Sequence, residues 1–334
     1  MTEPGTASSL GRAPGGTSRV LVGAVTAVIG AGIALQSRAH GELGQYVGTG
    51  LFPAWWSMTS GFVLLTVIVM TRRGLRAGVA VAVRAGRSRV LPWWAFTGGL
   101  LGSFFLVSQS VAVPITGVAV FTVGVVAGQV IGSLVADRIG LAGAGRRAVT
   151  TRRLAAAGIA VLAVLIGVSD RLGSATSVVA FAVLAVVAGV VTAPQQAFNG
   201  RVGLTAGSAF VGAWGSYLGG VLTMSVVLAV GLRGWVHLAD AWGAAPWTYA
   251  GGALGVAAIV GGAWAVPILG VLVFSLVSLF GQLAGALALD LLVPTPGTSV
   301  GWHLFVGVAT AGVAVAVAAG RRPPGGRRPQ EGSS

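Results

Sequence analysis

The sequence contains a long internal repeat. Residues 94–137 align without a gap on residues 247–290, at a constant offset of 153 residues. The shared landmarks keep their order and spacing: Gly98, Gly99, Gly102, Ala112, Val113, Pro114, Ile115, Gly117, Phe121, Gly128, Gln129, Gly132 and Asp137 recur as Gly251, Gly252, Gly255, Ala265, Val266, Pro267, Ile268, Gly270, Phe274, Gly281, Gln282, Gly285 and Asp290. A looser match at an offset of 159 residues joins Gln36, Gly44, Trp55, Ser57 and Gly61 to Gln195, Gly203, Trp214, Ser216 and Gly220. The chain therefore consists of two similar halves, each too long to be a solenoid unit.

The composition indicates a membrane protein. Hydrophobic residues make up 55% of the chain and charged residues 8%, and the mean hydropathy is +0.89. The fold class that we predict is therefore an all-α polytopic membrane protein. The 55 glycines suit close helix packing in lipid. The net charge of +14 lies on arginines beside apolar segments, so it indicates membrane orientation rather than nucleic-acid binding. The absence of cysteine excludes disulfides and thiolate metal sites.

Ten apolar segments are long enough to cross a hydrocarbon core of about 30 Å. They lie at residues 19–37, 48–70, 94–112, 114–136, 154–170, 176–197, 207–230, 248–265, 267–289 and 301–319. We place breaks at Val113–Pro114 and Val266–Pro267, because one kinked span at either place would be too long. The first span lacks a signal-peptide cleavage pattern and is expected to remain uncleaved. Residues 1–18 and 320–334 are rich in Gly, Pro, Ser and Arg, and are expected to form disordered cytoplasmic tails.

The positions of the arginines predict the orientation of these spans. With the N-terminus in the cytoplasm, only Arg38, Arg171 and Arg233 fall outside, which leaves 18 of the 21 basic residues inside (21 − 3 = 18). This distribution predicts that both termini are cytoplasmic. Because five is an odd number of spans, the repeats 19–171 and 172–319 enter the membrane from opposite sides. Such inverted five-helix repeats are typical of secondary transporters, whose substrate site lies between the halves near the membrane midplane.

Several short motifs resemble a known family. They are Gln36 with Gly44, Pro53-Ala54-Trp55, Pro92-Trp93-Trp94 with Gly98-Gly99-Leu100-Leu101-Gly102, Val113-Pro114, and Gly128-Gln129 through Asp137-Arg138-Ile139-Gly140-Leu141. The pattern resembles the drug/metabolite transporter superfamily, and in detail its bacterial YdcZ-type branch, whose members occur as five-span proteins or fused ten-span ones. The resemblance implies a transporter fold in the cytoplasmic membrane and names no substrate. Unlike the small multidrug-resistance proteins of the same superfamily, the first span has no acidic residue, so proton-coupled export of cationic drugs by that mechanism is not expected.

Neutral polar and aromatic side chains are the candidates for a substrate pathway, because all seven acidic residues fall in tails, loops or span ends. Gln36, Gln129, Gln195 and Gln282 offer both a donor and an acceptor without the desolvation cost of an ion. Their depths predict an outer pair, Gln36 with Gln282, and an inner pair, Gln129 with Gln195. The alternative role is hydrogen-bonding between helices. Trp55 and Trp214 lie about 10 Å into their spans, where each ring either lines a cavity or only packs.

Paired glycines and two aspartates complete the candidate residues. Gly98, Gly102, Gly128 and Gly132, with their partners Gly251, Gly255, Gly281 and Gly285, are expected to allow close helix packing or to act as hinges. Asp137 is expected to pair with Arg138 or with helix ends. Asp290 is the better candidate for a coupling ion, because its loop lacks arginine. His40, His237 and His303 fall in separate predicted outer loops and offer no metal-ligand spacing.

The segment Arg72–Arg89 places six arginines around the apolar run 77–83. It is either an interfacial helix attracted to anionic lipid or only a topology signal.

The function that these features favour is a secondary transporter or facilitator of a small organic metabolite or drug. The alternatives are a membrane-embedded lipid-modifying enzyme, which would need clustered acid, base or metal-binding residues, and a non-transporting scaffold. We expect no enzymatic activity, no cofactor and no metal. Without lysine, no Walker-type phosphate-binding motif is possible. Substrate identity, direction, coupling ion and oligomeric state are left open by the sequence.

Overall fold

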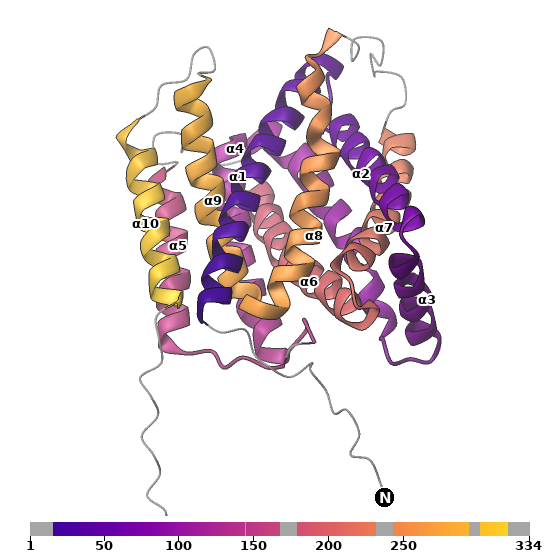
Figure 1. Cartoon of the computed structure of the whole chain (residues 1–334). Helices are drawn as coiled ribbons and strands as arrows, with labels where there is room; N and C mark the ends of the chain where they lie inside the picture. Colours follow the sequence, from indigo (N-terminus) through magenta and orange to yellow (C-terminus); the bar gives the residue numbers. More distant parts are fainter. Residues whose placement is uncertain (1–15, 144, 168–178, 232–242, 294–300, 320–334) are drawn as a thin grey trace, which may run out of the picture.

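The computed structural model describes residues 16–143, 145–167, 179–231, 243–293 and 301–319. In these ranges the chain forms helices and no strand (Figure 1). The elements are α1 (Gly16–Val47), α2 (Leu51–Thr71), α3 (Arg73–Arg87), the 3-10 turn η1 (Trp93–Phe96), α4 (Gly98–Ile139), α5 (Thr151–Gly167), α6 (Val179–Ala206), α7 (Ala209–Gly231), the 3-10 turn η5 (Pro246–Ala250), α8 (Gly251–Leu269), α9 (Val271–Leu292) and α10 (Trp302–Ala319). The predicted tails lie outside the described residues, except that residues 16–18 begin α1.

Within the described residues, six helices are long and apolar enough to cross a membrane. They are α1 from Arg19, α2, α7 as far as Val230, η5 with α8, α9 and α10. The all-helical membrane fold class is therefore confirmed, while the count of ten spans stays a prediction.

The prolines at the two predicted breaks, Pro114 and Pro267, do not end a helix. The helix α8 continues through Pro267 to Leu269, and the break lies at Gly270, whose φ of +88° suits glycine. In the first half the helical backbone of α4 runs across Pro114 without a break. Lost backbone hydrogen bonds at proline are tolerated in packed membrane helices. The two predicted spans of the second half are confirmed, with their break three residues later than expected, at Gly270, whereas the helical backbone of the first half is not interrupted at Pro114 itself.

The helix α1 also continues ten residues beyond the span predicted to end at residue 37. Arg38, His40 and Glu42, predicted to follow that span in a loop, lie on the helix instead. The Arg38 and Glu42 side chains form an ion pair 3.2 Å long, one turn apart on α1. Arg38 also donates a hydrogen bond of 2.8 Å to the carbonyl of Val293 at the end of α9. This polar stretch therefore belongs to the helical structure.

The first two helices of each half are joined by similar tight turns. Gly48 follows α1 with φ +72°, and Gly207 follows α6 with φ +70°. The two glycines are 159 residues apart, which is the offset of the looser sequence repeat. A positive φ is costly for other residues, so the same backbone requirement recurs in both halves.

Equivalent helices of the two halves pack against each other. Two indole nitrogens donate reciprocal hydrogen bonds of 3.0 Å, from Trp55 on α2 to Ser225 on α7, and from Trp214 on α7 to Thr66 on α2. Both the donors and the acceptors are related by the offset of 159 (55 + 159 = 214; 66 + 159 = 225). The start of each helix thus contacts the end of the other, so α2 and α7 lie antiparallel.

The centre of this pairing is a local two-fold axis. Gly61 approaches the ring of Tyr217, and Gly220 approaches the sulfur of Met58, again at related positions (61 + 159 = 220; 58 + 159 = 217). The midpoint of these reciprocal contacts lies near Ser60 on α2 and Gly219 on α7. The axis therefore passes between the middle of α2 and the middle of α7.

The helix α4 changes direction along its length. Four close approaches to α6 define its course: Gly98 to Asn199, Gly102 to Gln195, Gly128 to Val186, and Gly132 to Val190. A straight helix from residue 98 to residue 132 would be about 51 Å long, whereas residues 190–199 of α6 span only about 14 Å. The first part of α4 therefore runs antiparallel to α6, and its last part runs parallel to it. The chain therefore reverses direction between Gly102 and Gly128, so α4 comprises two helical arms that correspond to α8 and α9 of the second half.

The same arrangement recurs around α1. Gly281 and Gly285 of α9 lie against Ala27 and Ala31 of α1, which are the repeat partners of Val186 and Val190. At the edge of the molecule, α5 and α10 lie side by side (Figure 1). Their contact is built from small buried side chains: Ala156, Ala160 and Ala163 on α5, with Ala311, Ala314 and Ala318 on α10.

Candidate functional site

A polar cluster, which we call the histidine cluster, lies to one side of the two-fold axis. The Gln36 Nε2 donates a hydrogen bond of 3.2 Å to Ser57 Oγ. Both side chains lie against the glycine-rich start of α8: a Cβ atom at Gly255 would be 2.9 Å from Gln36 Nε2, and one at Gly251 would be 3.4 Å from Ser57 Oγ and 2.7 Å from His40 Nε2. The Tyr217 hydroxyl reaches the same place, because it would be 2.6 Å from the Gly255 Cβ. Four polar side chains thus meet at the start of α8: Gln36 and His40 from α1, Ser57 from α2 and Tyr217 from α7.

A second cluster, the asparagine cluster, occupies the related place on the other side of the axis. It contains Gln195 and Asn199 from α6 and Ser216 from α7, all three buried. These side chains lie against the start of α4, where a Cβ at Gly102 would be 2.5 Å from Gln195 Nε2 and one at Gly98 would be 3.4 Å from Ser216 Oγ.

Each member has a repeat partner in the histidine cluster: Gln195 with Gln36, Asn199 with His40, and Ser216 with Ser57. The counterpart of Tyr217 is Met58, so the two clusters differ.

The other two glutamines lie elsewhere. Gln282 Nε2 donates a hydrogen bond of 3.4 Å to Ser278 Oγ, one turn earlier on α9. The backbone of Gln282 lies against Gly30 of α1, six residues before Gln36, and the backbone of Gln129 lies against Gly189 of α6, six residues before Gln195. The contacts therefore place Gln36 and Gln195 in the polar clusters, and place Gln129 and Gln282 at the helix contacts next to them.

Asp137 joins the two halves at the junction between α8 and α9. Its carboxylate, on a side chain only 4% exposed, accepts hydrogen bonds of 2.8 Å from the N–H of Val271 and 3.1 Å from the N–H of Leu272. It also forms an ion pair with Arg153 rather than with Arg138. Free N–H groups at a helix start attract negative charge, so Asp137 caps α9. The expected pairing with a helix end is therefore seen, while that with Arg138 is replaced by Arg153.

Arg147 completes this junction from the loop before α5. Its guanidinium donates a hydrogen bond of 2.8 Å to the carbonyl of Leu269 and one of 3.2 Å to that of Ile268. Arg147 thereby caps the end of α8 while Asp137 caps the start of α9. Burial lowers the pKa of Arg147, the positive charges of Arg153 and Arg19 lower it further, and Asp137 opposes both effects.

Of the remaining candidate residues, Asp290 and His303 lie outside the two polar clusters and the junction between α8 and α9. Asp290 lies near the end of α9 and is partly exposed. His303 lies on α10 and His40 on α1, so their assignment to loops was wrong; His237 lies outside the described residues. In the part of the chain that the structure describes, no group of three His, Cys, Asp or Glu side chains is arranged to hold a metal.

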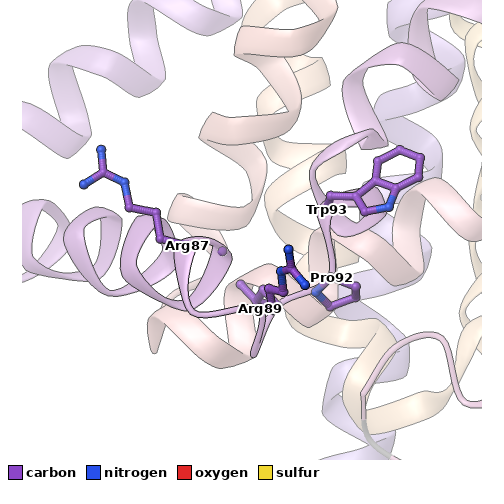
Figure 2. A pocket seen from close by; sticks show the side chains of 6 residues that line it. Arg87, Arg89, Pro92 and Trp93 are labelled. Carbon is purple, nitrogen blue, oxygen red and sulfur yellow. The ribbon is translucent and has the colours of Figure 1, made fainter.

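A shallow hollow of about 460 Å³ lies beside the end of α3. Gly86, Arg87, Arg89, Leu91, Pro92 and Trp93 line it. Figure 2 shows Arg89 between Arg87 and Pro92, with Trp93 on the far side of Pro92. Trp93 is 78% exposed, and both arginines are exposed. The helix α3 itself forms over 73–87 and buries Gly78, Ala82 and Ala85. A basic, aromatic surface therefore borders α3.

Of the seven members of the polar clusters, sequence reasoning assigned only Gln36 and Gln195 to the pathway; it did not assign His40, Ser57, Asn199, Ser216 or Tyr217 to it. Asn199 has a detectable signal, because the offset of 159 pairs it with His40 and both lie four residues after a predicted glutamine. Tyr217 has no such signal, since its counterpart Met58 is apolar. Only the antiparallel packing of α2 and α7 brings Tyr217 across the axis.

The comparisons with known proteins agree with the duplicated helical architecture. The family model described as "Putative inner membrane exporter, YdcZ" matches twice, over residues 21–166 and 180–317. A solved structure titled only "Crystal structure of protein" has a TM-score of 0.58 at 16% identity, and the alignment covers 90% of this chain and 96% of that one. This likeness shows the fold alone. No curated protein matches the chain. The two matched regions comprise most of the sequence, and the chain therefore belongs to the YdcZ-type branch of the drug/metabolite transporters, as a two-repeat, multi-pass protein of the cytoplasmic membrane.

Proposed function

We propose that the protein carries a small organic solute across the cytoplasmic membrane by alternating access between two inverted five-helix repeats. The observation that carries the proposal is the pair of related polar clusters on opposite sides of the α2–α7 axis. A substrate site near the midplane, at the interface of repeats, is the usual arrangement in transporters built this way. Exchange of conformation between two similar halves would expose first one cluster and then the other.

Ten spans and inward-facing termini are part of the same proposal. The antiparallel course of α2 and α7 supports the inversion, because equivalent helices of inverted repeats run in opposite directions. The doubling back of α4 supports two crossings within that element. With the N-terminus inside, the arginines of α3 and of the loop 145–150 face the cytoplasm, as the charge rule requires.

Within this proposal, Gln36 and Gln195 contact the solute. Trp55 and Trp214 form the hinge contact between the halves, while Gln129 and Gln282 support the adjoining helices. Gly128, Gly132, Gly281 and Gly285 hold helices at close distance. Asp290 is the candidate for coupling to an ion. A lipid-modifying enzyme finds no support, because neither polar cluster contains an acid or a metal-binding group of three residues.

The test uses the natural absence of cysteine. In Gln36→Cys and Gln195→Cys, a membrane-impermeant maleimide should label position 36 only from outside and position 195 only from inside. Prior modification of Gln36→Cys with a bulky reagent should then reduce labelling of Gln195→Cys in the double variant, because the outward-open form has been trapped.

Ser37→Cys is the matched control, because its side chain is exposed, points about 100° away from Gln36 around α1, and should face lipid. It should remain unlabelled from either side. Labelling of positions 36 and 195 from the same side contradicts the inverted arrangement, and no labelling at either contradicts the pathway. Comparison of secreted metabolites between cells that express the protein and cells that lack it would then identify the solute.

A further inference from the structure

His40 and Asn199 carry buried polar atoms that have no hydrogen-bond partner. These atoms are Nε2 of His40 and Nδ2 of Asn199. Asn199 is only 2% exposed. A buried polar group without a partner destabilises the folded protein, so an unpartnered group that persists needs an explanation. Here two such groups occupy the same position in the two repeats (40 + 159 = 199).

Both atoms belong to the polar clusters and not to scattered core sites. His40 lies one helical turn beyond Gln36 on α1, and Asn199 lies one turn beyond Gln195 on α6. The side chain of each lies against the first glycine of a partner helix: His40 Nε2 against Gly251, and Asn199, through its Oδ1 atom, against Gly98. A side chain at either glycine would occupy the place next to the polar group. On both sides of the axis, a polar side chain therefore lies opposite a glycine.

The two clusters are close enough to serve one solute in turn. The reciprocal contacts place Ser216 level with residues 63–64 of α2, between six and seven residues from Ser57. That separation is about 10 Å along the helix axis. Along the helix axis the two clusters are therefore separated by much less than the thickness of the membrane, about 30 Å.

The chemistry of the clusters limits the solute. Glu42, Asp137 and Asp290 are the carboxylates in the described residues; Glu42 pairs with Arg38, and Asp137 with Arg153. Neither cluster contains a carboxylate to balance a cation. The free Asn199 Nδ2 group is a donor and requires an acceptor oxygen, while a neutral histidine nitrogen can donate or accept.

We propose that His40 and Asn199 are the substrate-contacting ends of the pathway, and that they bind a neutral or anionic solute through its acceptor oxygens. The inference rests on the proposed transport function and deepens it. The two ends differ because His40 corresponds to Asn199 and Tyr217 corresponds to Met58. They therefore offer unequal hydrogen bonds, and the solute is held differently in the two conformations. Binding of the solute therefore shifts the equilibrium toward the conformation that holds it more tightly, while the direction of net transport follows the solute gradient or a coupled ion.

The first experiment separates a functional group from a structural one. His40→Leu and Asn199→Leu each remove an unpartnered polar atom, so purified variants should have a Tm equal to or above that of the wild type. The conservative exchanges His40→Asn and Asn199→His should keep transport, because each places the side chain of the other repeat at the related site. Transport by the two leucine variants should fall at least tenfold, measured by mass spectrometry of the solutes that wild-type cells secrete.

The outcomes are distinguishable. A lower Tm in both leucine variants overturns the inference, since the side chains would then be structural. Unchanged transport with an unchanged Tm also overturns it, as does a cation as the only solute secreted. If cells that express the wild-type protein secrete the same solutes as cells that lack it, the proposed transport function fails. In that case, labelling of His40→Cys and Asn199→Cys by a charged methanethiosulfonate reagent decides the inference separately: labelling from opposite sides supports two accessible polar ends, and labelling of neither rejects them.

Discussion

Asp137 shows how one carboxylate can connect the two repeats. It lies at the end of α4 in the first half, yet its hydrogen bonds go to Val271 and Leu272 at the start of α9 in the second. Its ion-pair partner Arg153 is also largely shielded from solvent, with a side chain 11% exposed. The related Asp290 is partly exposed near the end of α9, whereas Asp137 is buried, so the two repeat partners differ in their exposure to solvent.

We expect Asp137→Asn to destabilise the protein by about 3 kcal/mol, because removing one member of a buried ion pair leaves the other charge uncompensated. Asp290→Asn is the matched control and should change stability by less than about 0.5 kcal/mol. Tryptophan fluorescence during unfolding in detergent measures both effects. Equal stability of the two variants would show that Arg153 finds sufficient solvation without Asp137.

The sequence predicted the partners of Asp137 only in part. Attraction to a helix end follows from the position of a carboxylate beside a membrane helix, but which helix end depends on how the halves pack. Arg138 is adjacent in sequence, yet neighbouring residues on a helix point in different directions. Arg153 comes close only because the loop before α5 returns to the end of α4. Asn199 was missed although the offset of 159 residues pairs it with His40, because only the packed structure shows that its Nδ2 atom has no hydrogen-bond partner.

At the scale of helices, the main departure from the sequence prediction is that prolines lie inside elements. Pro267 lies within α8, and the backbone of α4 is helical on both sides of Pro114. The sequence located the change of direction within a few residues in the second half, but assigned it to proline instead of Gly270. Likewise, the charged residues Arg38 and Glu42 were taken to mark a loop. Their spacing of four is instead that of an ion pair on a helical face.

The helix α3 is an element whose role depends on the membrane. We propose that its arginines, with Arg89 and Trp93 at the adjoining hollow, hold the headgroup of an anionic lipid of the cytoplasmic leaflet. Each arginine near such a surface contributes about 1 kcal/mol. The triple variant Arg84→Gln, Arg87→Gln and Arg89→Gln should therefore bind phosphatidylglycerol roughly a hundredfold more weakly.

Native mass spectrometry of protein from nanodiscs that contain phosphatidylglycerol and phosphatidylcholine measures this retention. Arg138→Gln with Arg146→Gln is the control, since both residues are exposed arginines outside α3. Weaker lipid retention should follow only the substitutions at α3, and it should weaken further as salt rises. Equal loss in both variants would show a general charge effect, and no loss in either would leave the arginines as topology signals alone.

At the scale of the whole molecule, the two halves meet through glycines at related positions. A Cβ at Gly99 would collide with the carbonyl oxygen of Ser216 and lie 2.5 Å from the Gly220 nitrogen. A Cβ at the repeat partner Gly252 would lie 2.8 Å from the Gly61 nitrogen and 3.0 Å from the Ser57 oxygen. Backbone thus meets backbone between α4 and α7, and again between α8 and α2.

We expect Gly99→Ala and Gly252→Ala each to lower stability by roughly 1–3 kcal/mol, because the helices must separate to admit the methyl group. Gly215→Ala is the control on α7, where a Cβ meets nothing within 4 Å. Alanine is the better helix former, so this control should be neutral or stabilising by up to about 1 kcal/mol. Midpoints of unfolding in detergent measure all three variants. Tolerance of alanine at both Gly99 and Gly252 would mean that the halves are held less closely than these contacts imply.

The contact of Met58 with Gly220, and of Tyr217 with Gly61, also bears on the history of the chain. If the protein arose from a pair of identical five-helix subunits, every substitution near the axis appeared on both sides at once. A tyrosine could not then have been gained without losing both methionines. Joining the subunits into one polypeptide removed that restriction, and the two sides of a symmetric ancestor became free to acquire separate tasks.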